Sequence, residues 1–321
     1  MMDLINWGMG WIIAFFSIGL ILLFGSGHAL VQGSSRLARS LGIHPIIVGL
    51  TIVALGTSMP EFVVSLIAAI KGKTNVALGN IVGSNVTNIG LILGLSALTR
   101  PIAIHLKLLK FEVPLVVGIS FYFWAICSNG ALSRIDGFTL SVGFLAYLAI
   151  VISGAKKGSV TIEEKYKTLN KKEKRMGLNI LLIMVGIAGL TISAEWVVNS
   201  VSEISRRLGA SELVLGLTIV ALGTSLPELA TSIVAALKKE GDISAGNIVG
   251  SNIFNIMAIA GPSALANPIP VTKDIVYNHL PIMSVLTLIL FPLFKTGSKL
   301  GRKEGGFLLL CYLGIMAWWT L

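Results

Sequence analysis

The chain alternates between long apolar runs and short polar loops. A helix needs about 20 consecutive apolar residues to cross the hydrocarbon core of a bilayer. Ten runs are long enough, and each predicts one membrane-spanning helix. We place them at 9–33, 45–70, 76–98, 109–127, 137–153, 178–204, 211–237, 243–265, 276–294 and 305–321. The pattern therefore predicts an all-α membrane protein with ten transmembrane helices.

One stretch of the sequence occurs twice. Residues 49–61 read GLTIVALGTSMPE and residues 216–228 read GLTIVALGTSLPE, so twelve of thirteen positions are identical. A second pair, GNIVGSNVTNI at 79–89 and GNIVGSNIFNI at 246–256, has the same offset of 167 residues. A fixed offset indicates an internal duplication. We expect a first unit at 1–153, a cytoplasmic linker at 154–177 and a second unit at 178–321.

Each predicted unit contains five spans. Because five is an odd number, the second unit enters the membrane in the opposite direction to the first. We therefore predict two inverted five-helix repeats, an arrangement that is common among secondary transporters. In such proteins the broken helices of both repeats meet near the middle of the bilayer and bind the substrate there.

The composition and the distribution of charge support a membrane protein. Hydrophobic residues make up 54% of the chain and charged residues 12%, which is too apolar for a water-soluble fold. The net charge of +10 could suggest nucleic acid, but 19 of the 25 Lys and Arg residues fall on one side of the ten spans. Short cytoplasmic loops carry such an excess. We expect a multi-pass plasma-membrane protein that contacts lipid and no nucleic acid, with both termini extracellular.

Each copy of the first motif places an acid, Glu61 or Glu228, inside an apolar run. A charged side chain at the centre of a bilayer costs at least about 2.5 kcal/mol, and such residues are functional by default. Pro60 precedes the first acid and lacks an amide hydrogen, so the carbonyls of residues 54–57 are predicted to lose helical hydrogen bonds. A bound cation would satisfy these carbonyls, and the adjacent Thr-Ser pair would add hydroxyl oxygens.

The second motif adds polar side chains to an otherwise apolar span. Ser84 and Asn88 are four residues apart and therefore lie on one face of a helix. With the two acids they would form a hard oxygen shell, which suits Ca²⁺ or Na⁺ better than a transition metal. Cys127 and Cys311 are far apart, and we interpret them as packing residues. Glu195 stands where the first unit has His28, and either a polar partner or a role in ion access would explain it.

These motifs resemble the two alpha-repeats of the cation/calcium exchanger superfamily, and most closely those of the prokaryotic sodium/calcium exchangers. The resemblance implies that Glu61 and Glu228 bind both calcium and sodium, and that helices 9–33 and 178–204 slide against the other eight. It also assigns roles to the surrounding residues: carbonyls of Thr57 and Thr224 at the calcium site, Ala54, Ser58 and Ser84 at one sodium site, Ala221, Ser225 and Ser251 at its mirror image, and Asn88 and Asn255 at the centre.

The resemblance implies an electrogenic antiporter that exchanges Na⁺ for Ca²⁺ by alternating access. The alternatives in the same class are a Ca²⁺/H⁺ exchanger and a potassium-dependent Na⁺/Ca²⁺ exchanger, in which some relatives have an aspartate in place of Asn255. A cation channel and a membrane scaffold are alternatives from other classes. We expect no enzyme activity, no cofactor besides the transported ions, and a functional monomer.

Overall fold

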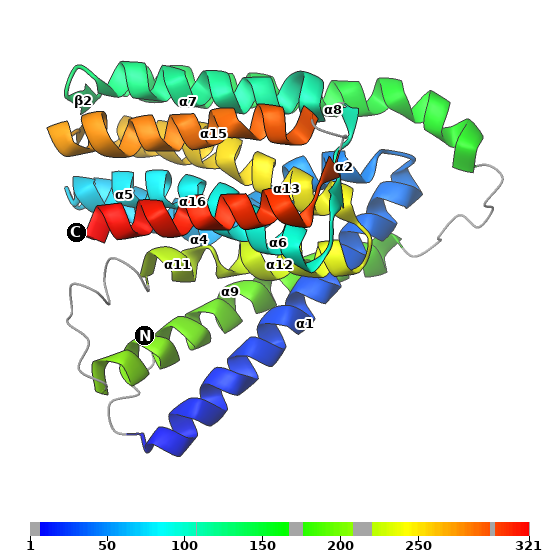
Figure 1. Ribbon diagram of the computed structural model, residues 1–321. Helices are drawn as coiled ribbons and strands as arrows, with labels where there is room; N and C mark the ends of the chain where they lie inside the picture. Colours follow the sequence, from blue (N-terminus) through cyan, green and yellow to red (C-terminus); the bar gives the residue numbers. More distant parts are fainter. Residues whose placement is uncertain (1–6, 107, 167–175, 208–219, 296–298, 321) are drawn as a thin grey trace.

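The computed structural model describes residues 7–106, 108–166, 176–207, 220–295 and 299–320, without the side chains of 155–166, 220, 221 and 320. Most of the described chain is helical, and most helices run side by side in one bundle (Figure 1). Two long helices, α1 (Met9–Leu41) and α9 (Met176–Arg207), pack against each other at one side of this bundle and slant across it (Figure 1).

The elements of the first half follow α1 in chain order, with η denoting a π-helical segment. They are α2 (Pro45–Val48), η1 (Gly49–Val53), α3 (Ala54–Thr57), α4 (Met59–Ile70), α5 (Thr74–Thr87), η2 (Asn88–Leu93), α6 (Gly94–Thr99), β1 (Ile102–Ala103), η3 (Leu108–Glu112), α7 (Val113–Cys127), β2 (Ala131–Leu132) and α8 (Arg134–Tyr166).

The second half repeats this order after α9. Its described elements are α11 (Val220–Thr224), α12 (Leu226–Leu237), α13 (Gly241–Ile253), η6 (Phe254–Ile259), α14 (Ala260–Ala266), β3 (Ile269–Pro270), η7 (Ile275–His279), α15 (Leu280–Lys295), β4 (Lys299–Leu300) and α16 (Arg302–Thr320). The starts of α4 and α12, of α5 and α13, and of α7 and α15 are all 167 residues apart. The offset of the sequence repeat is thus also the offset of the structure.

The helices confirm a membrane protein with several apolar spans. Seven helical stretches are long and apolar enough to cross a bilayer, and the bent pair Pro45–Thr57 and Met59–Ile70 forms an eighth. These eight match eight of the ten predicted runs. The start of run 211–237 lies outside the described residues, and its remainder contains the shorter apolar helix α12. The last run, 305–321, coincides with α16, apart from residue 321, which lies outside the described residues.

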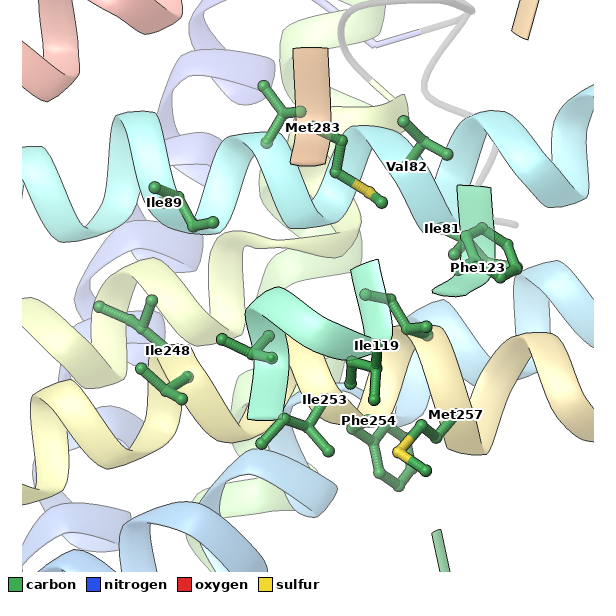
Figure 2. Packing of buried hydrophobic residues seen from close by; sticks show 14 of the residues in the cluster. Ile81, Val82, Ile89, Ile119, Phe123, Ile248, Ile253, Phe254, Met257 and Met283 are labelled. Carbon is green, nitrogen blue, oxygen red and sulfur yellow. The ribbon is translucent and has the colours of Figure 1, made fainter. Parts of the chain in front are cut away.

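The middle of the bundle is formed by the helices that carry the second motif. In the most apolar 18 residues of the stretch from α5 to α6, 78% of the residues are buried. The corresponding share is 89% for the stretch from α13 to α14 and 22% for α1. Figure 2 shows the apolar packing at this centre, where Ile81 of α5 lies beside Phe123 of α7, and Ile253 of α13 lies near Phe254 and Met257 of η6. Polar residues of α5 and α13 are therefore enclosed by protein.

Two features were not predicted from the sequence. Helix α8 continues to Tyr166, so residues 154–166, predicted to be linker, are helical. Lysine and glutamate, which are good helix formers, make up five of these thirteen residues and favour the extension. In addition, two-residue strands join the halves, because β1 pairs with β4 and β2 pairs with β3. Strands this short have no periodicity that a sequence pattern could reveal.

Candidate ion-binding site

Both copies of the first motif break a helix at a serine. Ser58 ends α3 with φ −85° and ψ 9°, and the chain bends by 49° before α4 continues. Ser225 separates α11 from α12 with almost the same angles, φ −89° and ψ 4°. The prolines Pro60 and Pro227 lie in the first turn of the following helix, where their missing amide hydrogen is tolerated. The predicted break is therefore present in both halves.

The break frees fewer carbonyls than predicted. The Ser58 amide donates to the Ala54 carbonyl at 3.0 Å, so the prediction that this carbonyl loses its helical bond is wrong. The reason is that α3 closes one complete turn before the chain bends. The Gly56 carbonyl is different, because the residue four positions later is Pro60, which has no hydrogen to donate.

The two acids lie at the contact between the halves, and each is hydrogen-bonded by a serine of the opposite half. Glu61 and Glu228 are each only 1% exposed. The Ser58 hydroxyl donates to Glu228 Oε1 at 2.7 Å, and the Ser225 hydroxyl donates to Glu61 Oε1 at 3.2 Å. Exchanging the two repeats turns one bond into the other, as expected for two units related by a pseudo-two-fold axis.

The serines of the second motif complete this cluster. Ser58 Oγ lies 3.0 Å from Ser251 Oγ and can accept from it while donating to Glu228, and Ser225 Oγ lies 3.5 Å from Ser84 Oγ. All four hydroxyl groups are at most 2% exposed. The structure therefore brings together residues that are up to 193 positions apart in the sequence.

Two buried asparagines, Asn80 and Asn247, hold the broken helices in position. Asn80 Nδ2 donates to Ser65 Oγ at 2.9 Å, and Asn247 Nδ2 donates to Ser232 Oγ at 3.0 Å. Their amide oxygens face the opposite half and accept from threonine hydroxyls: Thr224 donates to Asn80 at 3.3 Å and Thr57 donates to Asn247 at 3.1 Å. Ser65 and Ser232 were not among the predicted site residues, although their shared 167-residue offset was a visible signal.

Asn88 and Asn255 lie at the π-helical segments η2 and η6. Asn88 begins η2, and Asn255 is the second residue of η6. π-Helical turns are rare and occur frequently at functional sites. Asn88 Nδ2 donates to Asn252 Oδ1 at 3.1 Å, which joins α13 to η2. Both side chains are 1% exposed, so they face the interior.

Several buried oxygens of this cluster have no hydrogen-bond partner among the described residues. Buried polar atoms are normally paired, and an orphaned oxygen calls for a specific explanation. Two buried carboxylate oxygens and two buried amide oxygens would suit a hard cation, which binds oxygen ligands. These oxygens are Glu61 Oε2, Glu228 Oε2, Asn88 Oδ1 and Asn255 Oδ1.

The predicted site residues can now be located. The acids and serines form two equivalent hydrogen-bonded groups, one with Glu228, Ser58 and Ser251 and the other with Glu61, Ser225 and Ser84. Thr57 and Thr224 bond to Asn247 and Asn80, and Asn80 also donates to the Glu61 carbonyl. Ala54 is buried in α3, and the side chain of Ala221 lies outside the described residues. Among the described residues, no three His, Cys, Asp or Glu side chains are arranged to hold a metal. The acids of this cluster are therefore a single pair supplemented by neutral oxygens.

The two halves are covered differently by the long helices. Gly27 of α1 lies against α12, where an added Cβ would stand 3.4 Å from the Ala230 backbone, and Ala230 is 0% exposed. Val63, which occupies the equivalent position in α4, is 47% exposed. The same face is thus covered in the second half and open in the first.

Polar contacts reinforce the covered end. The Ser35 hydroxyl of α1 donates to Glu240 Oε1 at 2.5 Å, and Arg39 lies 3.9 Å from the same oxygen. Glu240 precedes α13, in the short connection that follows α12. These contacts hold the C-terminal end of α1 against the second half.

The fold and the site define a helical membrane protein in which two acids from two repeated halves are buried together among neutral oxygens. The family described as "Sodium/calcium exchanger protein" matches residues 11–153 and 178–321, which is most of the chain. The chain therefore belongs to the sodium/calcium exchanger protein family, and the predicted membership is confirmed.

Individual relatives extend the similarity over nearly the full length. The chain is 36% identical over 316 residues to the inner membrane protein YrbG of Escherichia coli, covering 94% of this chain and 95% of the relative. It is 30% identical over 334 residues to the sodium/calcium exchanger MaX1 of Methanosarcina acetivorans, covering 93% and 95%. A solved structure of the sodium-calcium exchanger NCX_Mj superposes with a TM-score of 0.83 at 31% identity, covering 96% and 98%.

Proposed function

We propose that this chain is a secondary antiporter that exchanges Na⁺ for Ca²⁺ across the membrane by alternating access. Membership of the family and the similarity to the sodium/calcium exchangers MaX1 and NCX_Mj support sodium/calcium exchange. The observation that carries the proposal is the pair of buried acids, Glu61 and Glu228, each held by a serine of the opposite half. Two carboxylates balance the charge of one Ca²⁺, and monovalent Na⁺ ions can occupy the same oxygens in its place.

The proposed ligands are the oxygens that converge on these acids. Glu61 and Glu228 bind either ion, and carbonyls of Thr57 and Thr224 complete the calcium site. Ala54, Ser58 and Ser84 form one sodium site and Ala221, Ser225 and Ser251 form the other, with Asn88 and Asn255 bordering the centre. The unpartnered acid and asparagine oxygens support this assignment. Because Asn255 carries no charge, exchange proceeds without potassium. We further propose that more than two Na⁺ move per Ca²⁺, which makes the cycle electrogenic.

We place this site in ten transmembrane helices that form two inverted repeats of five. The shared 167-residue offset of the helix starts and the reciprocal serine-to-acid bonds support this arrangement. The segment around 154–177 joins the repeats on the cytoplasmic side, where the basic residues are concentrated, and both termini are extracellular. The chain acts as a monomer in the plasma membrane and is a transporter without enzyme activity.

Alternating access requires two states that expose the site to opposite sides. The contact of α1 with α12, and the exposure of the equivalent face of α4, support assigning the described conformation to one of them. In the proposed orientation α12 ends on the cytoplasmic side, so this state is closed toward the cytoplasm. The opposite state forms when α9 covers α4 and α1 leaves α12.

Transport by the purified protein in liposomes tests this function. With Na⁺ loaded inside and Ca²⁺ outside, we expect Ca²⁺ uptake that depends on the Na⁺ gradient and stops when the gradient is removed. Uptake that follows a pH gradient and ignores Na⁺ would indicate a Ca²⁺/H⁺ exchanger, and a requirement for K⁺ would indicate a potassium-dependent one. Ca²⁺ flux without any counter-ion on the other side would indicate a channel. Each of these three results contradicts the proposal.

A further inference from the structure

Glu195 is an acid on α9 that takes no part in the cluster around Glu61 and Glu228. Its depth in the membrane follows from two contacts of α9. A Cβ at Gly56 would collide with Ile187, and a Cβ at Gly223 would collide with Val198. Both glycines directly precede the threonines of the first motif, so α9 crosses the two helix breaks between residues 187 and 198. Glu195 lies between these points and therefore at the depth of the ion site.

The Glu195 side chain is exposed, and no described basic residue lies within ion-pair distance of it. An exposed side chain at this depth faces either lipid or water. Facing lipid is costly for a charged carboxylate, and membrane acids almost always face a bundle interior or a water-filled cavity. Water is therefore the favoured surrounding for Glu195.

The neighbours of Glu195 on α9 indicate where this water lies. Residues spaced by three or four positions share one helix face. Toward the C-terminal end of α9 this face continues with the half-buried Asn199 and Ser202, and one turn before Glu195 it carries the exposed Thr191 beside the exposed, apolar Ile192. Farther toward the N-terminal end the same face has the exposed, apolar Ala188. We call Thr191, Glu195, Asn199 and Ser202 the α9 polar stripe. It runs from the level of the ion site to one end of the helix only.

We propose that the α9 polar stripe lines the outer access path for cations, and that Glu195 is a cation-recruiting residue within it. This inference rests on the proposed function and orientation, in which the C-terminal end of α9 is extracellular. A carboxylate in a narrow aqueous path raises the local concentration of cations and so speeds their arrival. Glu195 would bind incoming Ca²⁺ or Na⁺ transiently before the ion reaches Glu61 and Glu228.

The corresponding face of α1 explains why cation recruitment is expected only on the extracellular side. At the offset of 167 residues, His28 stands in place of Glu195 and Ser35 in place of Ser202. Ser35 is buried and bonded to Glu240, so the inner counterpart of the stripe is covered in this conformation. It also contains no acid. Glu240, the acid bonded to Ser35, lies beyond α12 at the cytoplasmic end, so cations arriving from the cytoplasm meet no acid of α1 at the depth of Glu195.

The test is the transport kinetics of E195Q in liposomes with one known orientation. We expect the KM for Ca²⁺ added on the extracellular side to rise by about threefold to tenfold at low ionic strength, with the maximal rate nearly unchanged. The KM for Ca²⁺ on the cytoplasmic side should stay at the wild-type value. The rise should shrink when a non-transported salt reduces the Debye length from about 30 Å at 0.01 M to about 8 Å at 0.15 M. An unchanged extracellular KM overturns the proposal.

Two further variants distinguish cation recruitment by Glu195 from a general effect of surface charge and from closure of the path by an ion pair. Asp274 is an exposed acid at the proposed extracellular side, and D274N should leave the extracellular KM unchanged. Lys71 stands where the other half has Lys238, whose Nζ donates to the His28 carbonyl. If Glu195 served only to close the path by pairing with Lys71, K71Q would raise the KM as E195Q does. Recruitment predicts instead that K71Q lowers the KM or leaves it unchanged.

Cysteine labelling tests the location of the path without transport. In a C311S background, Glu195→Cys should react with a charged, membrane-impermeant thiol reagent added outside and not with the same reagent added inside. Cys127 can stay because it is buried. A cysteine at this position that resists the reagent from outside would face lipid, and the proposal would be wrong. The proposed function fails separately, if the wild-type protein shows no Na⁺-dependent uptake at all.

Discussion

At the scale of single residues, the site is a reciprocal arrangement in which each half supplies what the other needs. The Ser58 hydroxyl donates a hydrogen bond to Glu228, and the Ser225 hydroxyl donates one to Glu61. Both acids remain fully buried beside each other, and burying charge without a counter-charge is costly. One oxygen of each carboxylate has no described hydrogen-bond partner. A bound cation would therefore offset the free-energy cost of burying the two carboxylates.

Replacing either acid by its neutral isostere should therefore have two opposite effects. We expect Glu228→Gln, and likewise Glu61→Gln, to weaken Ca²⁺ binding by on the order of 100-fold, or about 2.7 kcal/mol. Without ions the same variants should melt at a higher temperature than wild type, because a buried like-charge repulsion is removed. Isothermal titration and thermal melting in a chelator measure the two effects. Calcium affinity at the wild-type level in both variants would contradict the assigned role.

At the scale of elements, the site depends on helices that depart from the regular α form. The 49° bend after Thr57 and the π-helical segments η2 and η6 lie at the motif residues. Each departure leaves backbone or side-chain groups without a helical partner, and in a membrane such groups must be satisfied within the protein or by a ligand. The breaks therefore position ligands in advance of binding.

Restoring a backbone N–H at position 60, next to the first helix break, should weaken Ca²⁺ binding without preventing the protein from folding. In Pro60→Ala the new N–H can donate to the Gly56 carbonyl, which closes the helix and reduces the bend. We expect Ca²⁺ affinity to fall by on the order of tenfold, because the preorganised geometry is lost. Slower amide hydrogen exchange around residues 57–62 would report the closed helix.

The matched control for this change is another proline inside a helix. Pro292 lies within α15, outside the cluster around the acids, so Pro292→Ala should leave Ca²⁺ affinity unchanged. Equal affinities for Pro60→Ala and the wild-type protein would mean that the break does not position the ligands.

At the scale of the whole molecule, equivalent residues of the two similar halves differ in how far the long helices cover them. Ala230 is buried beneath α1, whereas Val63 at the equivalent position is exposed. The sequence identity of the motifs gives no preference for this asymmetry, so a second conformation with the roles exchanged should be close in energy. Contacts that one half makes and the other lacks then decide which conformation is populated.

The contact of Glu240 with α1 is such a contact, and weakening it should favour opening at the cytoplasmic end. In a C311S background, Ala230→Cys should be protected from an impermeant thiol reagent added inside. Adding Glu240→Gln should raise the labelling rate by about twofold to fivefold, as expected for losing an ion pair and hydrogen bond worth up to about 1 kcal/mol. Glu304→Gln, an acid that caps α16, is the control and should have no effect. Equal labelling rates with and without Glu240→Gln would rule out this role.

Much of this protein follows from the sequence by itself. Composition and run length determine that it is a helical membrane protein, because no soluble fold can bury so much apolar surface. The motifs reveal the duplication, the family and the acids Glu61 and Glu228. The helix breaks just before Pro60 and Pro227 follow from local chemistry, since proline removes its own hydrogen bond in any context.

Only the tertiary structure decides how the halves meet. The bond from Ser58 to Glu228 joins residues 170 positions apart, and no local pattern encodes such a pairing. The same holds for the threonine-to-asparagine bonds, for the short strand pairs and for the end at which α1 closes the bundle. Local rules act over a helical turn, whereas these features arise from packing between segments that are distant along the chain. Even at Ala54, where the chemistry is local, the number of helical turns that α3 completes before the bend determines that the carbonyl keeps its hydrogen bond.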